Sequence, residues 1–278
     1  MQGPVSQSLF ATQHLSTEWL MGIKMLLAGI AILAYVKFGK HQKLNVIWQR
    51  PKNRWVMLIY SLLGLSAVQY LYLLTVKNSN AATTTVMQSL GTVLIVIFTI
   101  FISRSLPQTK EIIAVGLAII GTWLLVTKGD INHLAISKTA LIFGLLLALA
   151  GALQTMIPVK LIAEYGSLLV IGWAMLIGGI VFSVCFPFWK NAPTLTLGTV
   201  LGVGFIVIFG TILAYICFMQ SLAYISPTVA GLLDTFEPLA ATLGMVLFLN
   251  TSFSWIEALG MLLAISTVFV LSVKTPKK

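Results

Sequence analysis

Two carboxylates three residues apart stand inside an apolar stretch of this chain. Asp234 and Glu237 lie in the run from Val229 to Leu249, which holds no other charged residue. A charge at the centre of a bilayer costs about 2.5–3.5 kcal/mol on insertion scales, so a chain that keeps two there is expected to use them. Residues three apart also share one face of a helix. The pair therefore predicts a buried acidic site.

The chemistry expected of this pair is proton exchange. Two carboxylates this close in a low dielectric do not both ionise readily, so the pair is expected to take up and release a proton. Pro238 lacks a backbone N–H, which would free a carbonyl beside the acids, as in the broken helices of transporters. Glu237 is the stronger candidate because it lies one turn deeper than Asp234 from the expected helix start at Thr228. Two alternatives stay open: a hydrogen-bonded, inert polar seam, or an Asp234 that is wet near its helix end.

The elements that must position these acids are membrane helices. Of 278 residues, 58% are hydrophobic and 9% are charged, and the mean hydropathy is +0.99. A soluble domain has about 25% charged residues, so this composition predicts an all-α polytopic membrane protein. Each apolar stretch of about 20 residues can cross the bilayer. We expect nine spans, at about 19–37, 55–76, 80–102, 110–127, 139–162, 168–189, 197–224, 228–249 and 255–273.

The basic residues predict the orientation of these spans. Twelve of the 17 Lys and Arg residues fall in one alternating set of loops and four in the other, while Lys24 lies inside the first span. By the positive-inside rule the richer set is cytoplasmic, which places the C-terminus in the cytoplasm of a cell (inner) membrane protein. The net charge of +10 therefore indicates orientation and contact with anionic lipid, and no nucleic-acid partner is predicted.

No metal, cofactor or enzyme chemistry is predicted. The three histidines, His14, His41 and His133, lie in polar connectors without the spacing of metal ligands. Cys185 and Cys217 both fall in apolar stretches, where a cysteine is usually a small hydrophobe. A membrane-embedded enzyme would need a clustered His, Ser–His or metal-spaced acid set, and none is readable.

The two halves of the chain repeat one another weakly. Four residues of the first span, Gly22, Met25, Leu26 and Gly29, recur 150 residues later as Gly172, Met175, Leu176 and Gly179. Gly64 likewise recurs as Gly210, 146 residues on. By the loop count the matching spans run in opposite directions, which predicts an inverted-topology repeat with halves 1–127 and 139–273. In such folds the substrate site lies near the midplane between the repeats.

The first repeat is expected to lack most of its opening helix. The second half begins with a full helix at about 139–162, whereas the first half has a counterpart only of its last turn, around Pro4. Either a misassigned start or a truncation removes a tenth span, or a nine-span protein is genuine.

Together these features resemble the EamA family of the drug/metabolite transporter superfamily. The resemblance rests on two inverted five-helix halves, Ala28-Gly29 in the opening span, and Glu237-Pro238 entering the penultimate helix. It implies a ten-helix inner-membrane carrier that exports amino acids, metabolites or toxic compounds on an ion gradient. Consistent with this, the chain has no Walker-type glycine loop. Lys24 stands where the family usually has an arginine before the Ala-Gly pair.

Three further residues are candidates for binding solute or ion. Lys24 either snorkels to the surface or serves as a counter-ion for Glu237 or for a substrate carboxylate. Gln88 occupies the counterpart position of Asp234, at the 146-residue offset, and follows a run of threonines that includes Thr85. Gln88 and Thr85 are therefore candidate hydrogen-bonding groups for substrate, the alternative being hydrogen bonds between helices.

Weaker candidates for a cavity lining are isolated polar residues in spans: Gln69, Tyr70, Tyr72, Gln154 and Gln220. The acids Glu111 and Glu257 open helices, where a carboxylate suits the helix dipole, and are interpreted as caps.

The sequence predicts a secondary transporter that exports a small organic solute by ion-coupled alternating access. Its partners would be the lipid bilayer, the solute, and a proton or other ion, while its oligomeric state is left open. Two alternatives remain, a non-transporting membrane scaffold and an inactive truncated transporter.

Overall fold

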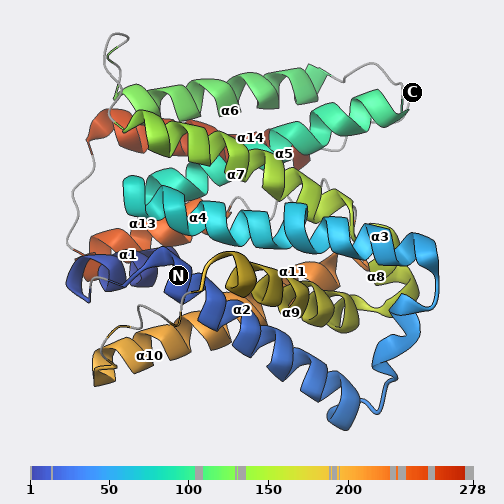
Figure 1. Ribbon diagram of the computed structural model, residues 1–278. Helices are drawn as coiled ribbons and strands as arrows, with labels where there is room; N and C mark the ends of the chain where they lie inside the picture. The colour runs from blue at the N-terminus through green and yellow to red at the C-terminus, as the bar shows by residue number, and fades with distance from the viewer. Residues whose placement is uncertain are drawn as a thin grey trace.

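A computed structural model describes residues 2–13, 15–103, 109–128, 136–187, 195–225, 236–249 and 254–272, with residues 130, 189, 193 and 230 between them. Every regular element in these ranges is a helix (Figure 1). Six continuous helices are long and apolar enough to cross a membrane, which confirms a polytopic membrane protein. They run over Thr17–Gly39, Pro51–Asn78, Ala81–Phe101, Lys138–Tyr165, Ser167–Cys185 and Leu197–Ser221.

Nine full spans are not established by these helices, because two further apolar helices are shorter and residues 226–229 and 231–235 lie outside the described part.

The first half contains α1 (Gln2–Thr12), α2 (Thr17–Ala34), η1 (Tyr35–Gly39), η2 (Leu44–Trp48), α3 (Pro51–Ile59), η3 (Tyr60–Ser66), α4 (Ala67–Asn78), α5 (Ala81–Ser103) and α6 (Thr109–Thr127). The second contains α7 (Lys138–Met156), α8 (Val159–Tyr165), α9 (Ser167–Cys185), α10 (Leu197–Phe205), η5 (Ile206–Leu213), α11 (Ala214–Ser221), α13 (Phe236–Leu249) and α14 (Trp255–Ser272).

Helix α1 is longer than the single turn that the sequence suggests. It has 11 residues and packs against α4, α13 and η5 (Figure 1). The chain then turns at Ser16, whose hydroxyl accepts a hydrogen bond from the backbone N–H of Trp19 at 3.0 Å and so caps α2. At 1.5 Å per residue, α1 is long enough to carry Gln2 about 15 Å from that turn, well into the helical bundle.

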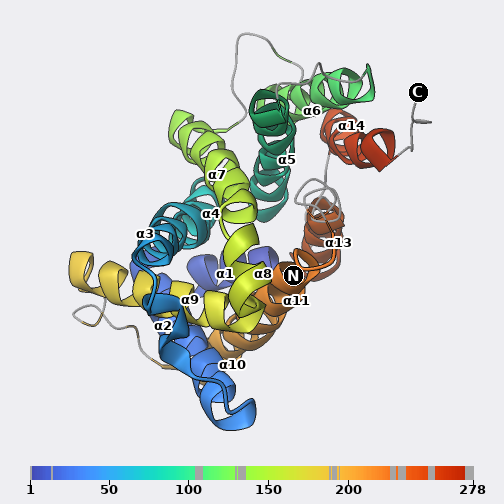
Figure 2. The same cartoon turned by 90° about the vertical axis from the view of Figure 1, so that its right-hand side faces the viewer.

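Helices α2 and α9 cross in close contact, and glycines allow their approach (Figure 2). A Cβ atom on Gly29 would lie 2.6 Å from the backbone nitrogen of Leu176. A Cβ on Gly179 would lie 2.9 Å from Cδ2 of Leu26. These four residues are among those that repeat at an offset of 150, and each glycine faces the other helix's leucine. Such exchanged contacts are what a two-fold relation between two helices produces.

Two long spans contain an internal stretch of π-helix at matching places, while a third π-helical stretch, η1, ends the span that begins with α2. Stretch η3 lies between α3 and α4, and stretch η5 lies between α10 and α11. Their first residues, Tyr60 and Ile206, are 146 positions apart, the offset that relates Gly64 to Gly210. Single π-turns inside α-helices often mark functional sites.

The largest buried core joins α2, η3, α4 and α9. Helices α6 and α14 pack on one another beside α5, at the far side of the bundle from α2 (Figure 2). Large apolar side chains such as Leu27, Leu197 and Leu262 remain exposed on the outer faces, as contact with lipid requires.

Candidate functional site

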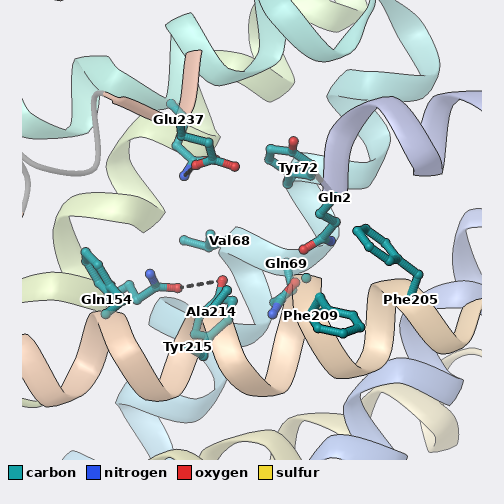
Figure 3. Close-up of a pocket in the computed structure, with 13 residues that line it drawn as sticks. Gln2, Val68, Gln69, Tyr72, Gln154, Phe205, Phe209, Ala214, Tyr215 and Glu237 are labelled. Atoms are coloured by element: carbon teal, nitrogen blue, oxygen red, sulfur yellow. Dashed lines mark hydrogen bonds between the residues drawn. The ribbon is translucent and has the colours of Figure 1, made fainter. Parts of the chain in front are cut away.

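A cavity of about 300 Å³ lies between helices of both halves of the chain (Figure 3). Its volume is at the low end of the range for small-molecule sites. It draws on α1, α4 and α5 from the first half and on α7, α10, η5, α11 and α13 from the second. It is lined by Gln2, Val68, Gln69, Tyr72, Gln88, Gln154, Phe205, Phe209, Gly210, Ala214, Tyr215, Phe218 and Glu237.

One side of the cavity carries a carboxylate. Glu237, in the first turn of α13, is partly buried and points into the cavity (Figure 3). Nε2 of Gln88 on α5 donates a hydrogen bond to Oε2 of Glu237 at 3.1 Å. Oε1 of Gln88 is buried and finds no hydrogen-bond partner among the described residues. Because a glutamine amide both donates and accepts, Gln88 can serve Glu237 as a carboxylate and, after the amide turns over, as a protonated acid.

On the other side of the cavity, a buried lysine lies behind two glutamine side chains of the lining. Lys24 on α2 is fully buried, and its Nζ donates to Oε1 of Gln69. In the amide orientation that satisfies its neighbours, Gln2 accepts a second hydrogen bond from Nζ at 2.9 Å and donates to the carbonyl of Gly210 at 2.7 Å. Lys24 therefore does not snorkel to the surface, which corrects that alternative, because the amides of Gln2 and Gln69 solvate its ammonium in the interior.

The remainder of the lining is largely aromatic. Phe205, Phe209 and Phe218 come from the span that contains η5, and the rings of the first two are 5.3 Å apart. The hydroxyl of Tyr215 donates to Oε1 of Gln154 at 3.4 Å, a contact drawn in Figure 3. An apolar wall facing a few fixed polar groups suits a small amphipathic solute.

The six strongest sequence candidates have different outcomes. Glu237 and Gln88 meet at the cavity, as the repeat offset suggested, and Lys24 lies one layer behind the lining. Thr85 is buried, but its hydroxyl donates to the carbonyl of Ala82 at 2.9 Å and it does not line the cavity.

The remaining two candidates adjoin the start of α13. Asp234 lies outside the described residues. Pro238 is the third residue of α13, which is described from Phe236 onward. A break of the helix beside Asp234 stays a prediction.

Three of the five weaker candidates line the cavity and two do not. Gln69, Tyr72 and Gln154 line the cavity. Tyr70 does not; its hydroxyl donates to Oε1 of Glu18 at 3.3 Å, and Gln220 is also absent from the lining.

Gln2 and Tyr215 are cavity residues that sequence reasoning missed. Gln2 had a faint signal, since it immediately precedes Gly3-Pro4, the match to the end of the second half's first helix.

Glu257 acts as a helix cap, as interpreted from the sequence. Its Oε2 accepts from the backbone N–H of Ser254 at 2.8 Å, and its own N–H donates to Oγ of Ser254 at 3.3 Å, a capping box. Lys128 pairs with Oε1 of the same carboxylate at 3.0 Å. The side chain of Glu111 lies outside what is described.

In the part of the chain that the structure describes, no group of three or more His, Cys, Asp or Glu side chains could hold a metal ion.

Comparison with known proteins gives one family and one fold. The profile of the EamA-like transporter family matches residues 3–127 and again residues 138–273. An uncharacterized inner membrane transporter of Salmonella typhimurium, YicL, is 33% identical over 279 residues, covering 99% of this chain and 92% of the relative. A solved crystal structure superposes with a TM-score of 0.69 over 96% of this chain and 93% of its own, at 16% identity, which shows a shared fold.

Proposed function

Because this chain belongs to the EamA-like transporter family, we propose that it is a secondary transporter that carries a small organic solute out of the cell by ion-coupled alternating access. Its transport site is the cavity described above, and Glu237 is the group that takes up and releases the coupling proton. One observation carries this proposal: a carboxylate faces a solute-sized cavity that helices of both halves enclose.

The proposed architecture is two inverted repeats, 1–127 and 139–273, in the cell (inner) membrane with the C-terminus in the cytoplasm. The exchanged contacts of Gly29 and Gly179 support the repeat, and so does the matching position of η3 and η5. The crowding of Lys and Arg into one set of loops supports the orientation. In such repeats, rocking of one half against the other exposes a central site to each side in turn.

The lining suggests which solutes fit. Glu237 and the amides of Gln69, Gln88 and Gln154 present both donors and acceptors, while three phenylalanines present apolar surface. We expect a solute with a polar, hydrogen-bonding end and an apolar or aromatic body. Binding of the polar end beside Glu237 would compete with its proton, and that competition is a simple means of coupling solute movement to an ion gradient.

The test uses purified protein in proteoliposomes that contain a pH-sensitive dye. Neutral amino acids and primary amines are applied one at a time as outward gradients, and solutes that move protons with the wild-type chain are kept. Glu237→Gln keeps the size of the side chain and its bond to Gln88 but cannot exchange a proton, so coupled proton movement is expected to vanish. Undiminished movement at every pH would sink the proton-site assignment.

Glu164→Gln is the matched control for this experiment. It removes an acid of the same type that pairs with Arg50 at 2.7 Å, on the surface and away from the cavity lining. Coupled proton movement through this variant is expected to equal that of the wild-type chain.

A further inference from the structure

The two internal π-helical stretches, η3 and η5, share a type of hydrogen bond that is unusual among the described helices. Oγ of Ser66 in η3 donates to the carbonyl of Ser61 at 2.6 Å, and Oγ1 of Thr211 in η5 donates to the carbonyl of Ile206 at 2.9 Å. Each acceptor lies five residues before its donor. Both hydroxyl side chains are buried, at 9% and 0% exposure.

Elsewhere in the described helices, a hydroxyl that donates to a carbonyl of its own helix typically reaches three or four residues back, as is usual in an α-helix. Thr75 donates to the carbonyl of Leu71 at 2.7 Å, and Ser183 donates to that of Gly179. A five-residue reach matches the i→i+5 register that defines a π-turn. The hydroxyls of Ser66 and Thr211 therefore reinforce the wide turn and not the ordinary one.

A wide turn changes which side chains face the cavity. A π-turn contains about one residue more than an α-turn, so each stretch rotates the helix that follows by roughly 100°. After η3 come Val68, Gln69 and Tyr72, and after η5 come Ala214, Tyr215 and Phe218. All six line the cavity, so both walls depend on the register set by the preceding stretch. An uninterrupted α-helix would turn these side chains toward other faces.

The neighbouring helix is fitted to the wide turn. A Cβ atom on Gly178 of α9 would lie 1.9 Å from Oγ of Ser66, so only glycine leaves room for this hydroxyl. At η5, a Cβ atom on Gly210 would lie 3.0 Å from Cβ of Gln2. The close approach lets Gln2 reach both the Gly210 carbonyl and Lys24.

We propose that Ser66 and Thr211 are a matched pair of positioning residues, one in each half, whose hydroxyls hold the π-turns that aim the following cavity-lining side chains into the transport site. The proposal rests on the proposed function in that it treats the cavity as the transport site. Neither hydroxyl touches the cavity itself; each acts through the register of its helix.

The experiment measures whether single cysteine side chains reach the aqueous cavity, and it needs no identified solute. The full chain in membranes first has Cys185 and Cys217, both free and exposed, replaced by serine. Single reporters are then introduced as Ala214→Cys, after η5, and Phe205→Cys, before η5, since both positions line the cavity. A water-soluble maleimide labels a thiol that reaches water, because the thiolate is the reactive species.

Adding Thr211→Val removes the hydroxyl while keeping the shape of the side chain. The labelling rate at position 214 is expected to fall about tenfold as the thiol turns from the aqueous cavity, with the rate at 205 unchanged. Thr211→Ser, which restores a hydroxyl, should return labelling at 214. A wild-type rate at 214 with Thr211→Val, or an equal fall at 205 and 214, would overturn the proposal, since general destabilisation moves both sites.

The first half provides a second arm in case Thr211→Val fails to insert. Ser66→Ala is combined with Tyr72→Cys as the reporter after η3, and Phe205→Cys on the other span is the control. Labelling at 72 should fall while labelling at 205 holds; no change at 72 would contradict the inference. The readout is thiol exposure and not flux, so loss of the proton-coupling assignment would leave this result unaffected.

Discussion

The two sides of the cavity hold opposite charges in different ways. Glu237 faces the cavity and accepts a hydrogen bond from the amide of Gln88. Lys24 is sealed behind the lining, and the two amides of Gln2 and Gln69 solvate it. A group that exchanges protons must meet water or solute, whereas a group that holds helices together need not. The comparison supports our proposal that Glu237 exchanges the coupling proton, with Lys24 organising the opposite wall.

Energetics support this division of roles. A buried ion carries a desolvation penalty of several kcal/mol. A hydrogen bond to a charged group contributes about 1.5–3 kcal/mol, so two amides offset much of the cost of Lys24. Those amides link α2 to α4 and, through the Gly210 carbonyl, to η5. The ammonium thus ties both halves of the chain together at the cavity.

The largest expected effect comes from removing one acceptor of the buried cation. Gln69→Leu leaves Lys24 with less solvation, and loss of a hydrogen bond to a buried charged group costs about 1.5–3 kcal/mol. The free energy of unfolding in detergent micelles measures this loss. The double variant Lys24→Met/Gln69→Leu should regain most of it, because the charge is gone.

Gln154→Leu is the matched control for that variant. This glutamine also lines the cavity but accepts a hydrogen bond from a neutral hydroxyl, so its loss should cost less than about 1 kcal/mol. If the Lys24→Met/Gln69→Leu chain were no more stable than Gln69→Leu alone, the cation would not be the source of the cost.

The next largest effect is expected from a substitution that shifts α2, the helix that carries Lys24, and leaves the hydrogen bonds of Lys24 unsubstituted. Gly29→Ala places a methyl group 2.6 Å from the backbone of Leu176 and pushes α2 from α9. Overpacking of this kind costs about 1–3 kcal/mol, measurable as a lower melting temperature. Gly116→Ala, with nothing within 4 Å of the added atom, should be neutral or slightly stabilising. Equal melting temperatures for the two variants would contradict the close packing of α2 on α9.

A smaller effect is expected on the Glu237 side. Gln88→Leu removes the donor to Glu237, and hydrogen bonds between membrane helices average about 0.6 kcal/mol with a maximum near 1.7. A double-mutant cycle of Gln88→Leu with Glu237→Leu, in which each single variant removes the hydrogen bond, isolates the coupling from unfolding free energies. A coupling of zero would mean that the two side chains do not interact.

The smallest effect belongs to an ion pair at the surface. Arg50 and Glu164 lie 2.7 Å apart, with side chains 71% and 39% exposed. Arg50→Ala should cost less than about 1 kcal/mol, and added salt should reduce the difference further. If Arg50→Ala lowered the free energy of unfolding as much as Gln69→Leu does, exposed and buried charges would contribute equally to stability, which contradicts the account.

Hydropathy made most of the fold predictable, since the six membrane-length helices coincide with predicted spans to within a few residues. The repeat offset also predicts that Gln88 lies opposite the acidic helix, and Gln88 donates a hydrogen bond to Glu237. The π-turns of η3 and η5 were not predictable, because a change of hydrogen-bond register leaves composition and periodicity almost unaltered.

The burial of Lys24 and the absence of Thr85 from the cavity lining depend on the hydrogen-bond partners that tertiary structure places near each side chain. Lys24 stays inside because α1 and α4 each supply an amide, and the sequence alone does not bring Gln2 and Gln69 together. Thr85 satisfies its hydroxyl on its own helix, an option open to every helical threonine.

Infrared difference spectroscopy across a pH titration of the membrane-embedded chain tests the central claim most directly, since it detects a protonated carboxylic acid without any solute. Glu237 as the exchanging group predicts a carboxylic acid carbonyl band that appears as the pH falls, persists in Asp234→Asn and is lost in Glu237→Gln. A band of unchanged intensity in Glu237→Gln would contradict the account.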